Sequence, residues 1–290
     1  MIFHLCEKQD WEKAREAGEY EAASLKKEGF IHLSTYGQIL SIANWWYKKS
    51  SEPILLMLDN NKISEHLKWE GEDCLDFPHL YRPIKVNEVL KTIPLNRVSD
   101  QFVDSEELQL AAEAITLSTE RLSLREFQLS DFDTVHEYAS DENLLKYMIW
   151  GPNTKLDTRA FFSRVFKWQS ENPREEYHFA VVENKSKTLV GGCNLSIDDI
   201  ETGVGSIGYI LNPKFHKLGY ATELSRELLR FGFKKLYLNR IDATCDKLNE
   251  PSFNVMKRIG MRQTDLILND KINGRIRNTV VCSIAKLSPQ

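Results

Sequence analysis

"NPKFHKLGYATELSRELLRFGFKKL", residues 212–236, places a glycine where a basic loop turns into an amphipathic helix. Gly219 and Ala221 leave the backbone uncrowded there, and the first N–H groups of a helix have no partner within the helix. The helix dipole adds partial positive charge at the same end. The stretch therefore predicts a site where a pyrophosphate lies across residues 217–222, with Lys217 as a counter-charge. The competing interpretation is that Gly219 only ends a loop.

The length and composition of the chain limit the classes of protein it can belong to. A chain of 290 residues has room for two domains. With 42% apolar and 28% charged residues and a net charge of -4, we expect a globular protein that does not bind nucleic acid. No apolar run approaches the roughly 20 residues of a membrane helix, and the N-terminal "MIFHLCEKQDWEK" becomes charged too early for a signal peptide. We therefore expect a cytoplasmic protein with no membrane partner.

The cysteines argue against a disulfide framework. They are odd in number, widely spaced and without a CxxC pair, so we expect reduced core thiols and no structural metal site. They are Cys6, Cys74, Cys193, Cys245 and Cys282.

A change in charge along the chain marks a boundary. Acidic residues are concentrated before about residue 110, where "DSEELQLAAEA" at 104–114 predicts a charged, helix-prone bridge. We expect a first domain at 1–100, a linker at 101–116 and a second domain at 117–288. In the first part the patterns predict strands at 2–6, 29–34, 53–59, 66–70 and 84–93, helices at 10–18 and 36–49, a turn at Asn60 and Asn61, and a loop at 76–83.

The second part alternates strands and helices in a mixed order. Ser130 and Asp133 predict a capping box at the start of a helix. Gly260 predicts the end of another helix. The patterns predict strands at 119–127, 177–184, 188–196, 205–212, 240–245 and 279–287, of which the second to fourth are antiparallel, and helices at 131–140, 155–169, after Gly219, and at 249–260.

Three segments of the second part resemble the GCN5-related N-acetyltransferases (GNAT) in order and spacing. They are "IGYILNPKFHKLGYATE", "RIDATC" and "NEPSFNVMKRIGM", and the resemblance covers roughly residues 117–288. "TERLSLREF" and the N-x-x-S-x-x-V-M run at 249–256 are similar to the ribosomal-protein N-acetyltransferases (RimJ/RimL type). The resemblance implies an α+β fold with a mixed, mostly antiparallel sheet flanked by helices, and acetyl-CoA as co-substrate.

The family's phosphate loop, Q/R-x-x-G-x-G/A, falls on residues 216–221. His216 replaces the usual Gln, Arg or Trp, and Lys217 replaces a frequent glycine. The resemblance implies that acetyl-CoA contacts Tyr209, Ile210, Leu211, His216, Lys217, Leu218, Gly219, Tyr220, Ala221, Thr222, Asn249 and Ser252.

The resemblance also implies catalytic roles. It places Asn249 and Ser252 beside the pantetheine arm and the leaving thiol, with Ser252 as general acid, although Asn249 could simply cap its helix. Relatives often carry a glutamate ahead of the strand "IGYIL", whereas this chain has Ser206, which is a poor base. Asp198 is the other candidate, and Asp198, Asp199 and Glu201 are equally explained as solvated surface.

The acceptor follows from the weakness of the base. An α-amine with a pKa near 8 is about one-tenth neutral at pH 7, while a lysine with a pKa near 10.4 is neutral roughly once in 2,500. We therefore expect acetyl transfer to a protein or peptide α-amine or a small primary amine, by direct attack in a ternary complex. Backbone N–H groups around Gly191 and Gly208 would polarise the thioester carbonyl.

Several alternatives stay open at this point. One is a non-catalytic, regulatory protein whose second half senses acyl-CoA. A homodimer is compatible with the sequence. "GVGSIG" at 203–208 fits G-x-G-x-x-G, but these glycines lead into a strand instead of opening a helix, so we do not expect a dinucleotide there.

Residues 1 to about 95 resemble domain-of-unknown-function family 952 through "IFHLC", "EGFIHLS", "ANWWY", "LKWE" and "FPHLYRPI". The resemblance implies a mixed α/β fold like that of ADP-ribosyltransferases, with a split antiparallel sheet. We expect His4, His32, Ser34 and His79 either to form a pocket for a nucleotide or NAD-like ligand or to be core residues of a structural or protein-binding module. Trp45 and Trp46 predict core packing, with one of the two facing outward.

Overall fold

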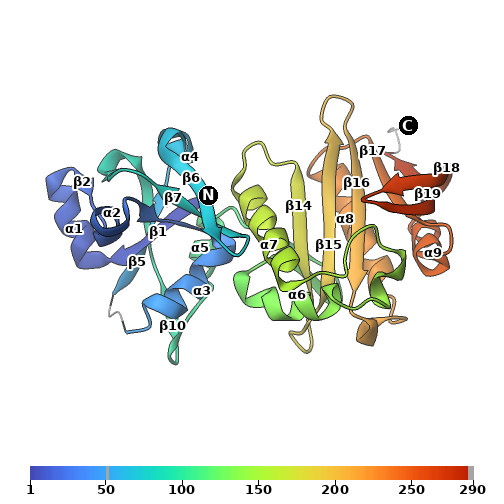
Figure 1. The fold of residues 1–290 in the computed structure, drawn as a ribbon, viewed down its shortest axis with the longest axis horizontal. Coiled ribbons are helices and arrows are strands. Elements are labelled where there is room, and N and C mark those ends of the chain that lie inside the picture. The colour runs from blue at the N-terminus through green and yellow to red at the C-terminus, as the bar shows by residue number, and fades with distance from the viewer. Residues whose placement is uncertain (50–51, 287–290) are drawn as a thin grey trace. The chain divides into compact units, whose positions relative to one another are not determined.

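The computed structural model describes residues 1–49 and 52–286 (Figure 1). Two compact units are found. The first comprises residues 1–115, 127–130 and 159–174, and the second comprises residues 116–126, 131–158 and 175–290. The domain bounds expected at 1–100, 101–116 and 117–288 stay a prediction. The last of these bounds, and the end of the predicted strand at Leu287, lie outside the described residues.

The first unit is built on three small antiparallel sheets. Their strand orders are β4-β1-β5-β9, β3-β7-β6 and β2-β8, and a further hairpin pairs β10 with β11. The elements are β1 (Ile2–Glu7), α1 (Lys8–Ala17), β2 (Glu19–Tyr20), α2 (Ala23–Glu28), β3 (Ile31–His32), β4 (Ser34–Thr35), α3 (Tyr36–Trp46), β5 (Pro53–Leu58), α4 (Asn60–Ile63), β6 (Leu67–Glu72), β7 (Leu75–Leu80), β8 (Ile84–Lys85), β9 (Val89–Pro94), β10 (Asn96–Val98), β11 (Gln101–Val103) and α5 (Glu106–Ala111).

The sheet that contains β1 separates two apolar cores. Ile2 packs in a core that includes Trp11 of α1. Phe3 and Leu5 pack in a second core that includes Ile39 of α3. Successive side chains of a strand point to opposite faces, so β1 must be apolar along nearly its whole length. This double burial explains the sequence "IFHLC".

Several expectations for this unit were wrong. The loop expected at 76–83 is largely strand β7, in which the Pro78 carbonyl accepts a hydrogen bond from Leu33 N at 2.9 Å. The strand expected at 84–93 is broken after β8, because the Glu88 carboxylate turns back to accept from Lys85 N at 3.0 Å. The turn expected at Asn60 and Asn61 opens helix α4 instead.

The tryptophans and one cysteine also differ from expectation. Trp45 and Trp46 are both exposed, at 62% and 77%, so neither packs in the core. They lie at the end of α3, beyond Ala43, which is the last buried residue of that helix. Four cysteines are buried as expected, but Cys74 is exposed in the turn between β6 and β7.

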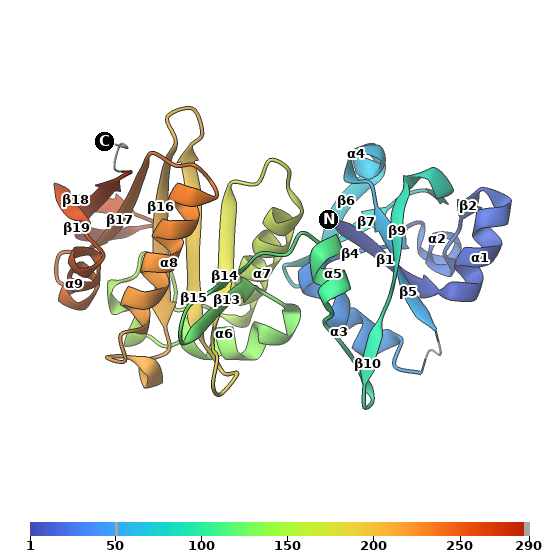
Figure 2. The same cartoon turned by 180° about the vertical axis from the view of Figure 1, so that it is seen from behind.

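The second unit has one eight-stranded sheet, in the order β12-β13-β14-β15-β16-β17-β19-β18. Its neighbours are antiparallel except β16 and β17, which are parallel. The sheet is flanked by helices, with α6 in front of it in Figure 1 and α8 in front of it in Figure 2. The elements are β12 (Thr116–Ser118), β13 (Leu122–Glu126), α6 (Phe132–Ala139), α7 (Lys155–Ser170), β14 (Glu176–Glu183), β15 (Leu189–Asp199), β16 (Val204–Leu211), α8 (Tyr220–Lys234), β17 (Arg240–Asp246), α9 (Glu250–Arg258), β18 (Arg262–Ile272) and β19 (Arg275–Ala285). From Arg159 onward, α7 belongs to the first unit.

The predicted mixed, mostly antiparallel sheet is confirmed, with two local corrections. No capping box forms at Ser130, because α6 begins after Asp131, whose carboxylate instead pairs with Arg125 at 2.7 Å. Strand β18 was missed, since it is an edge strand with mostly exposed residues and no clear alternation. Among residues 1–49 and 52–286, no helix combines the length and the apolar character needed to cross a membrane.

Candidate active site

The N-terminus of α8 has the geometry that its sequence predicted. Gly219 precedes the helix with φ +84°, and Lys217 has φ +62°, so two of three successive residues have left-handed backbone. No side chain among the described residues caps the first turn, which leaves its N–H groups open. Residues 216–219 are exposed. The loop therefore presents bare amides and the positive end of the helix dipole to any anion that reaches it.

Arg121, in the turn before β13, contacts this loop and the first turn of α8. Its Nη1 donates to Leu218 O at 2.9 Å, and its guanidinium lies over the Tyr220 ring at 4.7 Å. Its Nε donates to Glu223 Oε2 at 2.7 Å. The Tyr220 hydroxyl is held in turn by Glu183, at the end of β14. The loop and the first turn of α8 are thus fixed by contacts that the sequence analysis did not anticipate.

Strands β16 and β17 separate beside this loop. Their parallel pairing is confined to Val204–Ser206 on β16 and ends at Ser206 and Asp242. Beyond that point, residues 207–211 of β16 pair only with β15. His216 Nε2 donates to Leu211 O at 2.8 Å and so occupies one carbonyl of the freed strand. A strand edge that opens in this way offers main-chain groups to a ligand.

Asn249 and Ser252, which were given catalytic roles by resemblance, lie at the start of α9 and within reach of Tyr209. Asn249 accepts a hydrogen bond from Ser252 N at 3.2 Å, so it caps α9 as the simpler interpretation required. Tyr209 from β16 donates to Ser252 Oγ at 3.5 Å. Burial raises the pKa of the Tyr209 phenol, so it keeps its proton at neutral pH. The pair is a hydroxyl chain that can supply a proton.

A row of polar side chains crosses the sheet at the point where β16 and β17 separate. Glu176 lies opposite Ser196, Ser196 opposite Ser206, and Ser206 opposite Asp242. Directly paired residues share a face of the sheet. We call these four residues, together with Asp198, the polar row.

The polar row lies on the face opposite α8. Leu195 and Ile241 precede Ser196 and Asp242 in their strands, and a Cβ on Gly232 of α8 would touch both at 2.9 and 2.6 Å. Because side chains alternate along a strand, Ser196 and Asp242 must point the other way. A ligand would therefore approach the polar row from the face of the sheet opposite α8.

Hydrogen bonds and charge repulsion shape the row. Ser206 donates to Asp198 Oδ1 at 3.1 Å, so the two predicted base candidates touch. Ser196 donates to Glu176 Oε2 at 2.7 Å. Partial desolvation of its carboxyl group, followed by the charges of Glu176 and Asp242, raises the pKa of Asp198. Asp242 Oδ1 is buried without a hydrogen-bond partner in the described part of the chain, although Arg240 donates to Oδ2 at 3.1 Å.

The nearby acidic residues play a different role. Asp199 Oδ1 accepts from Glu201 N at 2.9 Å and from Thr202 N at 3.1 Å, so it stabilises the turn between β15 and β16. Glu201 is exposed. The interpretation of these two residues as solvated turn fits the structure.

Sequence reasoning missed Glu176, Ser196 and Asp242. Ser196 and Asp242 each follow an apolar residue in a predicted strand, so the alternation placed their side chains on the opposite face from that residue, whereas Glu176 lies just before the predicted strand at 177–184. Nothing in the sequence gave the register that aligns them with Ser206. The glycines of "GVGSIG" lead into β16 and open no helix, as expected.

The predicted histidines of the first unit partly come together. His32 lies opposite His79 on adjacent strands, with ring centroids 5.1 Å apart, and His4 Nδ1 donates to the His32 carbonyl at 2.8 Å. Burial lowers the pKa of His4 to about 4, and its Nε2 is buried with no hydrogen-bond partner among residues 1–49 and 52–286. Ser34 is buried on β4, opposite Phe3. Whether this group binds a ligand stays a prediction.

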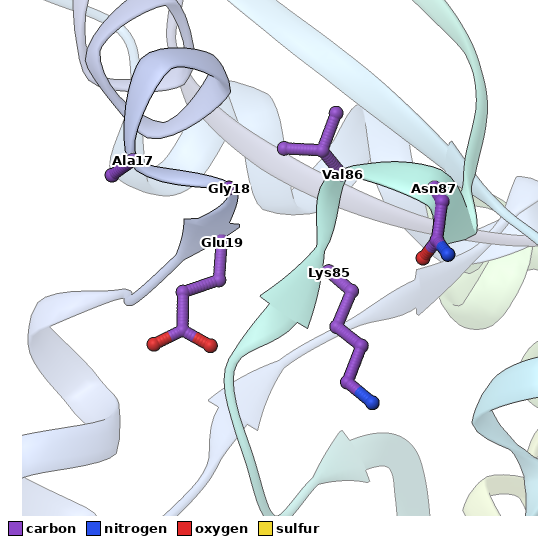
Figure 3. A pocket seen from close by; sticks show the side chains of 6 residues that line it. All are labelled: Ala17, Gly18, Glu19, Lys85, Val86 and Asn87. Carbon is purple, nitrogen blue, oxygen red and sulfur yellow. The ribbon is translucent and has the colours of Figure 1, made fainter.

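The hollows of the first unit lie elsewhere. One of about 540 Å³ lies between the end of α1 and β8, and Figure 3 shows the side chains of Glu19, Lys85 and Asn87 around it. It is open and mixed in polarity. Its lining includes none of the predicted histidines, and neither does that of a second hollow of about 510 Å³ beside it. Neither hollow therefore supports the predicted nucleotide pocket.

Two family models match the chain. Residues 121–262 match a model described as an acetyltransferase (GNAT) domain. Residues 5–92 match a family of proteins of unknown function, DUF952, which brings no activity with it.

Individual proteins match the second half of the chain. An uncharacterized N-acetyltransferase of Bacillus subtilis, YnaD, is 37% identical over 147 residues, which cover 51% of this chain and 82% of that protein. The crystal structure of a GNAT-family acetyltransferase from Bacillus anthracis is 32% identical, with a TM-score of 0.52, over 59% of this chain and 98% of that one. A spermidine N-acetyltransferase from Vibrio cholerae, solved with CoA and spermine, shares the fold at 21% identity and a TM-score of 0.51, over 58% of this chain and 96% of that one.

Proposed function

This chain belongs to the GNAT family of acetyltransferases, and on that basis we propose that it acetylates a positively charged primary amine held on the polar row. Family membership makes it an acyltransferase with acetyl-CoA as co-substrate, which disfavours the alternative of a non-catalytic acyl-CoA sensor. The proposed acceptor is a protein or peptide α-amine, as in the RimJ/RimL type, or a small amine.

The observation that carries this proposal is the group of three carboxylates on the row. Glu176, Asp198 and Asp242 lie close enough for two of them to raise the pKa of Asp198. In the part of the chain that the structure describes, only Glu176 and Asp242 have a basic partner nearby, His178 and Arg240, each at 3.1 Å. Among the described residues Asp242 Oδ1 is buried without a hydrogen-bond partner, and an unpaired buried oxygen of this kind costs stability unless a donor reaches it. An ammonium group supplies both the opposite charge and the missing donors.

The proposed roles of the residues follow from their positions. Open amides at 217–222 would hold the diphosphate of acetyl-CoA, and the freed edge of β16 would hold its pantetheine arm. Asp198 takes one proton from the bound ammonium, and the neutral nitrogen attacks the thioester carbonyl. The new C–N bond forms, the C–S bond breaks, and Ser252 gives its proton to the departing sulfur.

Each proton then has a defined destination. Tyr209 is placed to return a proton to Ser252, since its hydroxyl is the donor to Ser252 Oγ. The nitrogen sheds its second proton to solvent as the amide forms, Asp198 later releases the first one, and Tyr209 regains a proton from solvent. Overall the reaction yields one acetylated amine, one free thiol and one proton released to solvent. General acid and base groups of this kind typically contribute about 10²- to 10⁴-fold in rate.

The test is thiol release from acetyl-CoA with a panel of amines. The panel contains peptides with a free N-terminus, the same peptides blocked at the N-terminus but carrying lysine, and linear polyamines. Asp198→Asn is expected to lower kcat by about a hundredfold. The matched control is Asp199→Asn, which removes the adjacent carboxylate that only stabilises the turn. Equal activity of the two variants would exclude Asp198 as the base.

The pH profile gives an independent check. Because the pKa of Asp198 is raised, its carboxylate is protonated at a higher pH than an ordinary aspartate. The wild-type kcat/KM should therefore fall toward acid pH as Asp198 takes up its proton, and Asp198→Asn should lose that part of the profile. No thiol release with any amine of the panel would refute the proposed function.

A further inference from the structure

The first turn of α8 contains an acid where the cofactor's diphosphate would bind. Glu223 lies four residues after Gly219, and its carboxylate reaches back to the turn before β13. A carboxylate in the first turn normally stabilises a helix. Here it would compete with the diphosphate for the same positive end and would repel it. A site for a dianion therefore requires that Glu223 be neutralised by some other group.

We propose that Arg121 is a positioning residue of the acetyl-CoA site, whose role is to neutralise Glu223 and hold the phosphate loop open. The inference rests on the proposed function, because it concerns the same cofactor site. Arg121 lines neither of the two hollows described above and does not belong to the polar row. It lies 102 residues before Glu223 in the chain.

Four contacts satisfy the Glu223 carboxylate from one turn. Thr119 Oγ1 donates to Oε1 at 2.6 Å, and Arg121 N donates to the same oxygen at 2.9 Å. Arg121 Nε donates to Oε2 at 2.7 Å, and Arg121 Nη2 lies 2.6 Å from Oε2. Both oxygens are thereby turned away from the open amides of α8. Charge-assisted pairs of this shape are among the stronger polar contacts in proteins.

The carboxylate is charged at neutral pH. Partial burial alone would raise the pKa of Glu223, but the hydrogen bonds from Thr119 and Arg121 and the charge of Arg121 outweigh it and lower that pKa. Removing Arg121 would take away the counter-charge and two of the side-chain contacts of this carboxylate beside the loop. The guanidinium is the group that cancels it.

The same guanidinium sets the shape of the loop. Its Nη1 binds the carbonyl of Leu218, and a Cβ on Gly219 would lie 3.4 Å from its Nη2. With the Leu218 carbonyl turned toward Arg121, the Gly219 N–H of the same trans peptide points to the other side. Charge neutralisation and loop geometry thus depend on one side chain, so variants must separate them.

The experiment measures acetyl-CoA affinity by calorimetry on the full chain, with kcat and KM from thiol release. Arg121→Gln is expected to weaken acetyl-CoA binding about tenfold and to raise the KM for acetyl-CoA by a similar factor, with kcat at saturation unchanged. Glu223→Gln should bind at least as well as wild type. The double variant Arg121→Gln/Glu223→Gln should recover most of the loss, because it removes the bare carboxylate.

Two further variants keep the test decisive. Arg121→Lys retains the charge with fewer donors and should stay within about threefold of wild type. Arg230→Gln is the matched control, since Arg230 pairs with the buried Glu227 at 2.5 and 2.7 Å on the same helix but away from the loop. It should leave acetyl-CoA affinity unchanged.

The outcomes separate the two levels of inference. If Arg121→Gln binds acetyl-CoA like wild type, or if the double variant is as weak as Arg121→Gln, neutralisation by Arg121 is overturned. If wild-type protein does not bind acetyl-CoA at all, the proposed function is overturned, and this inference with it. Thermal unfolding of each variant shows whether a loss of affinity follows from a loss of folding.

Discussion

Replacing Gly219 with alanine tests the phosphate loop directly. The backbone of Gly219 has φ +84°, a conformation that costs a residue with a Cβ about 1–2 kcal/mol. Within the described residues, the added Cβ would have one neighbour closer than 4 Å, Arg121 Nη2 at 3.4 Å, which is an ordinary contact, so steric overlap adds little. The penalty is therefore conformational, and the loop can escape it only by leaving the shape that exposes its amides.

Binding of acetyl-CoA must then supply the energy that restores the loop. A cost of about 1–2 kcal/mol corresponds to roughly a 5- to 30-fold rise in the Kd for acetyl-CoA. Calorimetric titration of the full chain measures it. Gly29→Ala is the matched control, because Gly29 has φ +89° with no atom within 4 Å of the added Cβ and lies after α2 in the other unit. It carries the same backbone penalty without touching the loop.

The two variants should differ both in affinity and in how much stability they lose. Gly29→Ala is expected to lose about 1–2 kcal/mol in the unfolding free energy of its unit, whereas Gly219→Ala should lose less, because its loop leaves the strained shape until acetyl-CoA binds. Gly29→Ala should bind acetyl-CoA as wild type does. An unchanged Kd in Gly219→Ala would show that the amides at 217–222 do not hold the diphosphate, and the assignment of the site would be abandoned.

Three other variants probe the remaining sites. Ser252→Ala should lower kcat about tenfold or more at unchanged acetyl-CoA affinity, and equal turnover in thiol release would make the hydroxyl structural. Arg82→Ala leaves the buried Glu88 without its partner, 2.7 Å away, and should cost about 3–5 kcal/mol in urea unfolding at pH 7. Burial would raise the pKa of Glu88, but Arg82 and Lys85 lower it. The stability that the pair contributes is therefore present above the ordinary carboxyl pKa and is lost as the pH falls. Unfolding midpoints of wild type and variant that fail to converge toward acid pH would contradict the assignment. If the first unit binds a nucleotide, NAD or ADP-ribose should raise the melting temperature of wild type but not of His79→Ala, whereas a structural module should show no shift.

The backbone geometry of the loop at 216–219 was predictable, because it depends on residues that are close in the sequence. A glycine with a left-handed backbone, an uncapped first turn and an amphipathic helix follow one another within residues 216–236, and each is visible in the sequence. The order of strands and helices around it was predictable for the same reason. Edge strand β18 escaped because its exposed residues lack the alternation that burial imposes. The RimJ/RimL subtype, the homodimer and the ADP-ribosyltransferase-like fold of the first unit remain predictions.

The sequence by itself determined the family, the glycine-led start of helix α8 and the Ser252 hydroxyl next to the Asn249 cap, since these depend on residues that are neighbours in the chain. Only the tertiary structure decided that Glu176 and Asp242 share a row with Ser206, because strand register is set by pairing between distant segments. It also decided that Arg121 meets Glu223 across 102 residues. Contacts of that kind arise from packing, and no local pattern encodes which distant residue will be the partner.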